Sequence, residues 1–170
     1  VQRAIGNLYM ESGQLDRARE AFASALAITP GDLLTQVDMA ATWQEQDPAR
    51  AEQQLLYIID QHPGSPFAYG SLQYLYFMQG RYPEAITYAQ AEVDLVPGDR
   101  RAMSNLAGNM VMAGRFAEAR PLLEKAVKRN SLMFGTDHNN LASVLFFEGD
   151  FERAEQLFQK AVESAPEDPL

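Results

Sequence analysis

Only two side chains in the 170-residue sequence have ordinary pKa values near neutral pH, those of His62 and His138. An imidazole can act as a general base or as a metal ligand, but both roles need further groups at suitable spacing. His62 stands beside a proline in "DQHPGS", and His138 stands in "GTDHNN", in the first turn of an expected helix. Neither has a second ligand at metal spacing, and no G-x-x-x-x-G-K-[ST] phosphate loop is present. We therefore expect a protein that is not an enzyme, without a cofactor or metal site, whose histidines have structural or solvent-facing roles.

Composition narrows the class of partner. The net charge of −9 argues against nucleic acid, whose phosphates require a basic face. No run approaches the roughly 18 apolar residues of a membrane span, so we expect no direct membrane insertion. Cysteine is absent, which excludes disulfides and thiolate sites and fits a reducing or an oxidising compartment. We favour the cytoplasm, with the periplasm as the alternative.

One basic segment interrupts the acidic sequence. Residues 100–131 contain seven basic and two acidic side chains, whereas the segments on both sides have an excess of acidic residues. Arg100 and Arg101 begin this segment at the start of an expected helix. Either the segment balances the charge of its acidic neighbours, or it docks an acidic partner segment.

A short pattern returns along the whole chain, marked by Ala18, Ala51, Ala85, Ala119 and Ala154. The intervals between these alanines are 33, 34, 34 and 35 residues. Four of them have a glycine five residues before, namely Gly13, Gly80, Gly114 and Gly149. Four have a proline twelve residues after, namely Pro30, Pro63, Pro97 and Pro166. A fixed period of this length predicts a solenoid of stacked repeats.

Each repeat predicts a helical hairpin, because apolar residues recur at three- and four-residue steps across two blocks. The glycine ends the first helix in a left-handed conformation, and the proline ends the second. The second repeat instead has Asp47 and Pro48, which predict a capped start for its second helix. The expected helices span residues 2–12 and 15–28, 33–46 and 48–61, 66–79 and 82–95, 100–113 and 116–129, and 136–148 and 151–164.

The segment "IGNLYMESGQLDRAREAFASALAITP" resembles the tetratricopeptide repeat family, and five copies in phase extend the resemblance over the chain. The resemblance implies an all-α, right-handed superhelical solenoid of five helix–turn–helix repeats. We expect these repeats near residues 1–32, 33–65, 66–99, 100–133 and 134–168, in a single domain over residues 1–170. Because residue 1 is Val and lies within a periodic segment, we expect the chain to be a fragment of a longer protein.

The family resemblance also implies that the first helices line a concave groove through their second, fifth, ninth, twelfth and thirteenth repeat positions. These positions are Arg3, Asn7, Met10 and Glu11 in the first repeat; Leu34, Val37, Ala41, Gln44 and Glu45 in the second; Phe67, Gly70, Tyr74, Phe77 and Met78 in the third; Arg101, Ser104, Gly108, Val111 and Met112 in the fourth; and Thr136, Asn139, Ser143, Phe146 and Phe147 in the fifth. Phe67, Tyr74 and Phe77 share one helical stripe with Met78, and such side chains often anchor interfaces.

We therefore expect a protein-interaction module that binds a peptide or partner segment in its groove. The predicted contacts are Phe67, Tyr74, Phe77, Met78, Val111, Met112, Phe146 and Phe147, with Arg101 and Asn139 orienting the partner. The aromatic stripe could instead be core or a contact between copies. The alternative functions are self-assembly through exposed solenoid ends, and a docking or sensory arm of a larger bacterial signalling kinase or transcription regulator.

Some family members hold a C-terminal carboxylate between basic and Asn side chains on successive first helices. Arg3 and Asn7 match this clamp. Asp38, Phe67 and Ser71 do not match it, and an aspartate would repel a carboxylate. The sequence therefore disfavours a carboxylate clamp.

Overall fold

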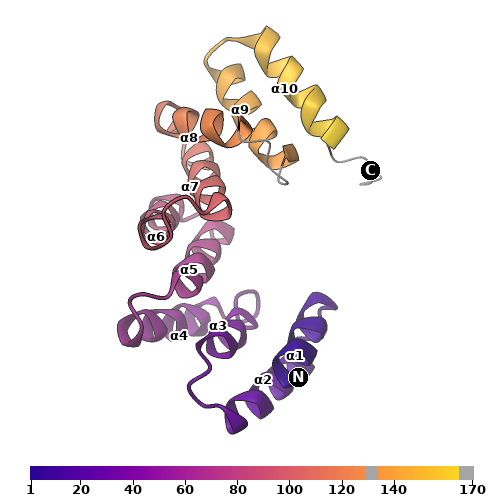
Figure 1. Ribbon diagram of the computed structural model, residues 1–170, viewed down its shortest axis with the longest axis vertical. Coiled ribbons are helices and arrows are strands. Elements are labelled where there is room, and N and C mark those ends of the chain that lie inside the picture. Colours follow the sequence, from indigo (N-terminus) through magenta and orange to yellow (C-terminus); the bar gives the residue numbers. More distant parts are fainter. Residues whose placement is uncertain (129–133, 165–170) are drawn as a thin grey trace. The chain divides into compact units, whose positions relative to one another are not determined.

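A computed structural model describes residues 1–128 and 134–164, and this part of the chain contains ten α-helices and no strand. The helices are α1 (Gln2–Glu11), α2 (Leu15–Ile28), α3 (Leu33–Ala41), α4 (Pro48–Gln61), α5 (Pro66–Met78), α6 (Tyr82–Leu95), α7 (Arg100–Met112), α8 (Phe116–Lys128), α9 (Phe134–Phe147) and α10 (Phe151–Ser164) (Figure 1). The predicted all-α class is confirmed, and the number of helices agrees with five hairpins. The repeat boundaries expected near 133 and 168 lie outside the described residues.

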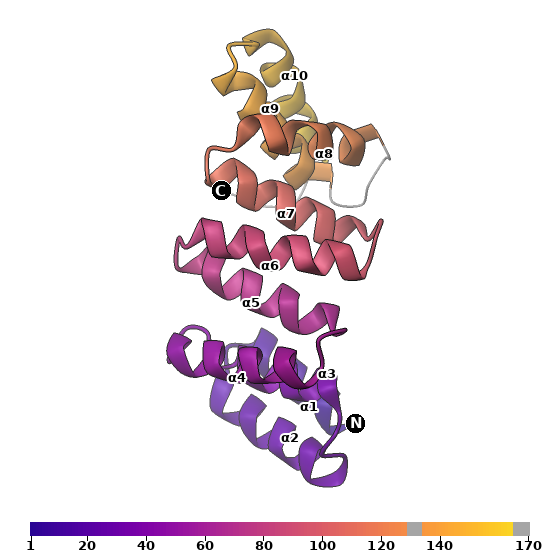
Figure 2. The ribbon, with the colours of Figure 1, turned by 90° about the vertical axis from the view of Figure 1, so that its left-hand side faces the viewer.

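The chain divides into two compact units, unit 1 (Val1–Gly80) and unit 2 (Arg81–Leu170). Unit 1 contains α1 to α5, and each of these helices packs on the next one along the chain (Figure 2). Unit 2 contains α6 to α10, which pack in the same sequential manner. The prediction of a single solenoid domain over residues 1–170 stays a prediction.

The recurring alanines lie where helices cross closely. Ala18, Ala51, Ala85 and Ala119 are completely buried, and Ala154 is almost so. A still closer approach occurs between α1 and α2, where a Cβ atom on Gly6 would lie 2.4 Å from Cε1 of Phe22. Small residues at these positions therefore allow the helices to pack at native density.

A left-handed glycine ends the first helix of most hairpins, as predicted. Gly13 has a φ of 72°, and Gly114 has a φ of 71°. After α1, the amide of Gly13 donates to the carbonyl of Met10 and that of Gln14 to the carbonyl of Tyr9. These bonds satisfy carbonyls that the helix end would otherwise leave unpaired.

The second repeat departs from its predicted helix, because α3 ends at Ala41 and not near residue 46. Residues 42–46 form turns, and the Thr42 carbonyl accepts a 2.8 Å hydrogen bond from Nη2 of Arg19. Asp47 also precedes Pro48, which disfavours helical backbone at Asp47. The predicted cap is confirmed, since Oδ1 of Asp47 accepts from the amide of Arg50 at 3.1 Å.

The core of unit 2 is a single apolar cluster built from α6 to α10. Leu123 of α8 and Val144 and Leu145 of α9 are fully buried in it. Pro121 lies inside α8 and removes one backbone donor from this helix.

Candidate partner-binding surfaces

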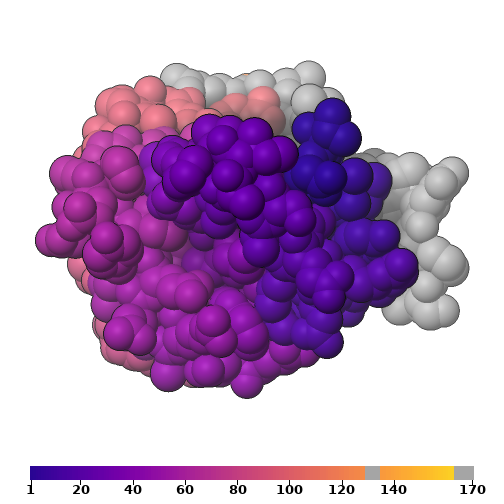
Figure 3. Space-filling view, turned by 90° about the horizontal axis from the view of Figure 1, so that it is seen from below, coloured from indigo at the N-terminus to yellow at the C-terminus, as the bar shows by residue number. Residues whose placement is uncertain are grey.

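Unit 1 contains a hollow of about 480 Å³ where the ends of its helices meet. Six residues predicted to face the groove line it, namely Met10, Ala41, Gln44, Glu45, Tyr74 and Met78. We call this cavity the unit 1 hollow. These six residues come from α1, from α5 and from the end of α3 with the turn that follows it, and Leu15 of α2 and Pro48 of α4 also line the hollow. In Figure 3 the indigo surface of α1 and α2 adjoins the violet surface of α3.

Tyr74 and Met78 supply the exposed apolar surface of α5 in this hollow. Tyr74 is 49% exposed and Met78 is 60% exposed, one helical turn apart. Phe67 is half exposed on the same helix, but it is not among the residues that line the hollow. Phe77 is only partly exposed and does not line it either. Of the four predicted aromatic-stripe residues, two therefore meet in the cavity.

Other predicted groove positions have packing roles. Val37, Gly70 and Ser104 are buried. Val111 is partly buried against the apolar core of unit 2. These positions were assigned from the family pattern alone. That pattern does not specify how far each first helix of this protein is rotated about its own axis.

Two hydrogen bonds hold the wall of the hollow. Nε2 of Gln44 donates to the carbonyl of Ser71 at 3.1 Å and links the turn after α3 to α5. Oη of Tyr76 donates to Oε1 of Glu52 at 2.8 Å and links α5 to α4. These two bonds therefore connect the α5 side of the hollow to α4 and to the turn after α3.

Sequence reasoning missed the residues that shape the turn after α3. The guanidinium groups of Arg19 and Arg50 stack on the ring of Trp43, with Cζ atoms 3.6 and 3.8 Å from its centroid. Arg19 also donates to Oγ1 of Thr42 at 3.1 Å and to Oε1 of Gln46 at 2.6 Å. Thr42 itself lines the hollow, so Arg19 holds one side of it in place. The sequence signals no such contact, because Arg19 and Trp43 belong to different repeats.

The carboxylate-clamp positions are engaged with each other. Nε of Arg3 lies 2.7 Å from Oδ2 of Asp38, and both side chains are partly buried. The guanidinium therefore already has a carboxylate partner from within unit 1. The sequence-based argument against a carboxylate clamp stays a prediction.

In unit 2, the predicted residues Phe146 and Phe147 belong to a chain of four rings. Phe116 stacks on Phe147 with centroids 4.8 Å apart, and Phe146 contacts Phe147 edge to face at 5.9 Å. Phe146 also meets Phe151 edge to face at 5.3 Å. We call Phe116, Phe146, Phe147 and Phe151 the Phe cluster. Phe146, Phe147 and Phe151 are more than half exposed, so the cluster forms an apolar surface where α8, α9 and α10 meet.

Arg101 was predicted to orient a partner, but it has a partner within unit 2. Its Nη2 lies 2.9 Å from Oε1 of Glu92, a completely buried residue of α6. Burial raises the pKa of the Glu92 carboxyl, while Arg101 opposes that shift. Arg101 therefore offsets the charge of a buried carboxylate. Glu92 was not singled out from the sequence, where nothing distinguishes it from a surface glutamate.

Two further side chains of unit 2 that were predicted to contact a partner are exposed. Met112 and Asn139 are exposed at the end of α7 and the start of α9.

In the basic segment, Arg115 pairs with Glu118 at 2.6 Å, and Arg120 pairs with Glu124 at 3.0 Å and with Glu148 at 2.5 Å. Arg101 and Arg120 thus reach acidic residues of the flanking segments, whereas Arg115 pairs within the basic segment itself.

The histidines lie apart from these surfaces. His62 caps the C-terminal end of α4 and is exposed, and His138 is buried in the second turn of α9. Within residues 1–128 and 134–164, no group of three or more metal-ligating side chains comes together. None of the helices described is long and apolar enough to cross a membrane.

Comparison with protein families decides the identity of the repeats. A tetratricopeptide repeat model matches residues 41–100 and 111–169, and a second one matches residues 1–32. The chain belongs to the tetratricopeptide repeat family. No curated protein matches its sequence. Tetratricopeptide repeats and this fold support a protein-interaction or scaffold module.

Solved structures share the tetratricopeptide fold of this chain at low sequence identity. A crystal structure of MamA aligns with a TM-score of 0.74 and 22% identity over 95% of each chain. PilF of Pseudomonas aeruginosa aligns with a TM-score of 0.82 and 20% identity over 96% of this chain and 74% of its own. A thermophilic tetratricopeptide protein of Thermus thermophilus, TTC0263, aligns with a TM-score of 0.78 and 18% identity over 98% of this chain and 91% of its own.

Proposed function

We propose that this tetratricopeptide protein binds a segment of a partner protein, with an apolar side chain of that segment inserted into the unit 1 hollow. The observation that carries the proposal is the meeting of six predicted groove residues around one cavity. Those residues belong to three different repeats and have no common packing role. A recognition site requires that residues of several repeats converge on one cavity, whereas a packed core does not require this.

The lining fits an apolar anchor. Met10, Tyr74 and Met78 offer thioether and aromatic surface, which is common at sites that recognise protein side chains. The volume of about 480 Å³ lies within the range of roughly 300–1,000 Å³ that is usual for ligand sites. One large apolar side chain and part of its backbone can enter such a space.

The polar residues that line the hollow favour a positively charged residue next to the apolar anchor of the partner segment. Glu45 is exposed beside Gln44 on the turn that lines the cavity. Residues 1–80 contain nine acidic and four basic side chains, so the surroundings attract positive charge. The preferred segment therefore has a bulky apolar residue next to Lys or Arg.

Selection from a peptide library displayed on phage tests the proposal. Peptides that bind the wild-type protein are measured by calorimetry against Tyr74→Ala and Met78→Ala variants. We expect each substitution to weaken binding by roughly tenfold or more, since an anchor contact contributes about 1–3 kcal/mol. Helical circular dichroism should stay unchanged, because both side chains are exposed.

Tyr57→Ala is the matched control, since Tyr57 is an exposed tyrosine of α4 that does not line the hollow. It should bind the selected peptides like the wild type. Equal affinity of the Tyr57, Tyr74 and Met78 variants for every selected peptide would place recognition elsewhere. In that case Met112, Asn139 and Phe147 of unit 2 are the predicted groove residues to test next.

A further inference from the structure

A cleft of about 300 Å³ lies in unit 2 between α8 and α10. Val127 of α8, Leu141 of α9 and Leu157 of α10 give it an apolar floor, since all three belong to the core of this unit or pack against it. None of the residues predicted to face the groove lines this cavity, because α8 and α10 are the second helices of their repeats. We call it the α8–α10 cleft.

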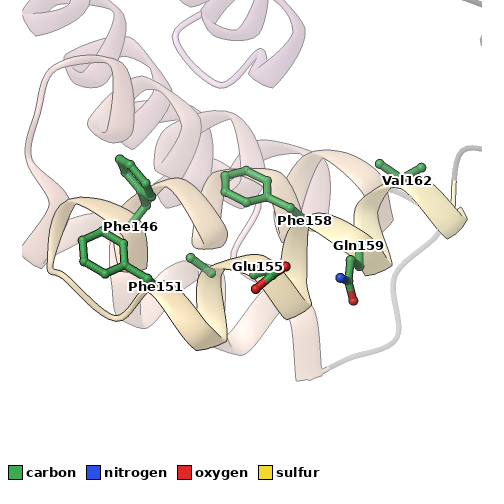
Figure 4. A pocket seen from close by; sticks show the side chains of 7 residues that line it. Phe146, Phe151, Glu155, Phe158, Gln159 and Val162 are labelled. Atoms are coloured by element: carbon green, nitrogen blue, oxygen red, sulfur yellow. The ribbon is translucent and has the colours of Figure 1, made fainter.

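The cleft uses the face of α10 that is turned towards α8. The opposite face of this helix contains Phe151, Phe158 and Val162, with Phe146 of α9 beside them (Figure 4). Those residues line a different hollow, and none of them lines the α8–α10 cleft. A segment packed on the face shown in Figure 4 would therefore leave the cleft open.

Cationic side chains surround the apolar floor. Lys128 of α8 and Arg153 and Lys160 of α10 line the cleft, and all three are exposed. The acidic member of the lining is Glu124, whose Oε1 accepts from Nε of Arg120 at 3.0 Å. Lys128 has no ion pair within the part of the chain that the structure describes. The cleft is therefore a basic site in a chain whose net charge is −9.

The packing of the repeats does not require the two lysines. By the alanine alignment, Lys128 and Lys160 correspond to Ala27 and Tyr57 in unit 1, and Lys128 corresponds to Asp94 at the end of α6. A lysine near the C-terminal end of a helix stabilises that helix, which accounts for Lys128. It does not account for Lys160, which precedes the last turn of α10.

Arg153 completes the rim of the cleft from the first turn of α10. Its Nη1 lies 3.3 Å from Oδ2 of Asp150, and both side chains are partly exposed. An exposed ion pair of this kind contributes little to stability. A carboxylate that enters the cleft can therefore compete with Asp150 for the guanidinium.

We propose that the α8–α10 cleft binds an acidic segment of a partner protein. One apolar side chain of the segment lies on the floor, and Asp or Glu residues on both sides of it face the cations. Charge complementarity supports this occupant, because Lys128 and Lys160 stand on opposite walls and each can pair with a carboxylate. The floor favours such a segment over a bare phosphate or a lipid headgroup, which would leave Val127 and Leu157 uncovered.

Peptide selection tests the proposal separately from the unit 1 hollow, whose lining favours a positively charged segment. The bait is the full chain with Tyr74→Ala and Met78→Ala, and the probe is a library of random peptides displayed on phage. We expect enrichment of peptides in which Asp or Glu flanks a large apolar residue. Enrichment of peptides without this pattern, or no enrichment at all, would overturn the proposal.

Charge reversal then locates the bound peptide. Calorimetry with a selected peptide compares Lys128→Glu and Lys160→Glu, and each should weaken binding about fivefold or more, since repulsion replaces attraction. Lys125→Glu is the matched control, because Lys125 is exposed on α8 outside the cleft and its reversal changes the net charge equally. Equal losses in all three variants would indicate attraction by the whole basic segment and would contradict a site in the cleft.

The contribution of the floor is tested on the peptide. Replacing its apolar residue by Ala should weaken binding about tenfold, and the bound peptide should shift the methyl NMR signals of Val127 and Leu157. Unchanged affinity after this replacement would show that the peptide binds through charge alone. Vesicles of phosphatidylcholine and phosphatidylserine test the lipid alternative. Sedimentation of the wild type with these vesicles, lost in Lys160→Glu, would overturn the assignment to a peptide.

Discussion

Glu92 and Arg101 form an ion pair in which the carboxylate is buried and the guanidinium is half exposed. Oε1 of Glu92 accepts from Nη2 of Arg101 at 2.9 Å, while Oε2 has no hydrogen-bond partner among the residues described. The pair joins α6 to the start of α7. It also places a titratable group inside unit 2, where its charge state affects stability.

Stability should depend on pH through Glu92. Burial is the largest cause that raises the pKa of this carboxyl above its ordinary value of 4.5, and Asp99 adds to it. A carboxyl with a raised pKa in the folded state stabilises the fold at low pH, and this contribution is lost as the pH rises through the folded pKa. The free energy of unfolding of the wild type should therefore fall relative to Glu92→Gln between pH 4 and neutrality. Urea titrations across this range measure the difference, and a constant difference would contradict the prediction.

Removing the guanidinium should destabilise unit 2. We expect Arg101→Met to lower the free energy of unfolding by about 1–3 kcal/mol at pH 7, because the buried carboxylate loses its partner. The double variant Arg101→Met with Glu92→Gln should recover much of this loss. Arg153→Met is the control, since the ion pair of Arg153 with Asp150, at 3.3 Å, lies on the surface.

Gly6 should not tolerate a methyl group. A Cβ atom there would lie 2.4 Å from Cε1 of Phe22, a completely buried ring. Gly6→Ala should therefore cost about 1–3 kcal/mol of stability, although alanine is the better helix former. At Gly108 the nearest atom would be Nδ2 of Asn140 at 3.4 Å, so Gly108→Ala should be neutral or stabilising. Equal melting temperatures for the two variants would mean that α1 and α2 separate easily.

Arg19 should control the environment of the single tryptophan. Arg19→Met removes the stacked guanidinium and the donors to Thr42 and Gln46. We expect a changed Trp43 emission spectrum and a loss of about 1–3 kcal/mol, because the Thr42 carbonyl loses a charged donor. Arg17→Met, on the same helix and stacked on Tyr9 instead, should leave the emission unchanged.

The Phe cluster should stabilise the junction of α8, α9 and α10. Phe147→Ala removes the ring stacked on Phe116 and should cost about 1 kcal/mol, because Phe147 is two-thirds exposed and its burial is incomplete. Phe147→Leu should cost less. Thermal unfolding followed by circular dichroism compares the two variants, and an unchanged melting temperature for Phe147→Ala would show that the stacked pair contributes little.

The helices could be predicted from the sequence because each follows from local chemistry. Glycines at Gly13 and Gly114 and the Asp47–Pro48 pair determine where helices begin and end, and the structure confirms all three. The early end of α3 could not be predicted in this way. It depends on Arg19 of the preceding repeat, whose guanidinium takes a carbonyl that the helix would otherwise use.

The candidate site was predicted in part. Repeat position identified Tyr74 and Met78 as groove residues, and both line the unit 1 hollow. The same rule misplaced Val37 and Gly70, which are buried, because side-chain exposure depends on helix rotation. Arg101 was predicted to orient a partner, because no local pattern reveals that Glu92, nine residues earlier, is buried and pairs with it.

The polar links between neighbouring repeats differ from one junction to the next. The residue after the recurring alanine is Arg19, Glu52 and Arg120 in three of the repeats, and its partners are a backbone carbonyl, a tyrosine hydroxyl and a carboxylate. The apolar contacts between neighbouring hairpins are alike, so a chain with its hairpins in a different order would still bury them. It would nevertheless place unmatched polar groups opposite one another, so these three side chains favour the observed order of the hairpins.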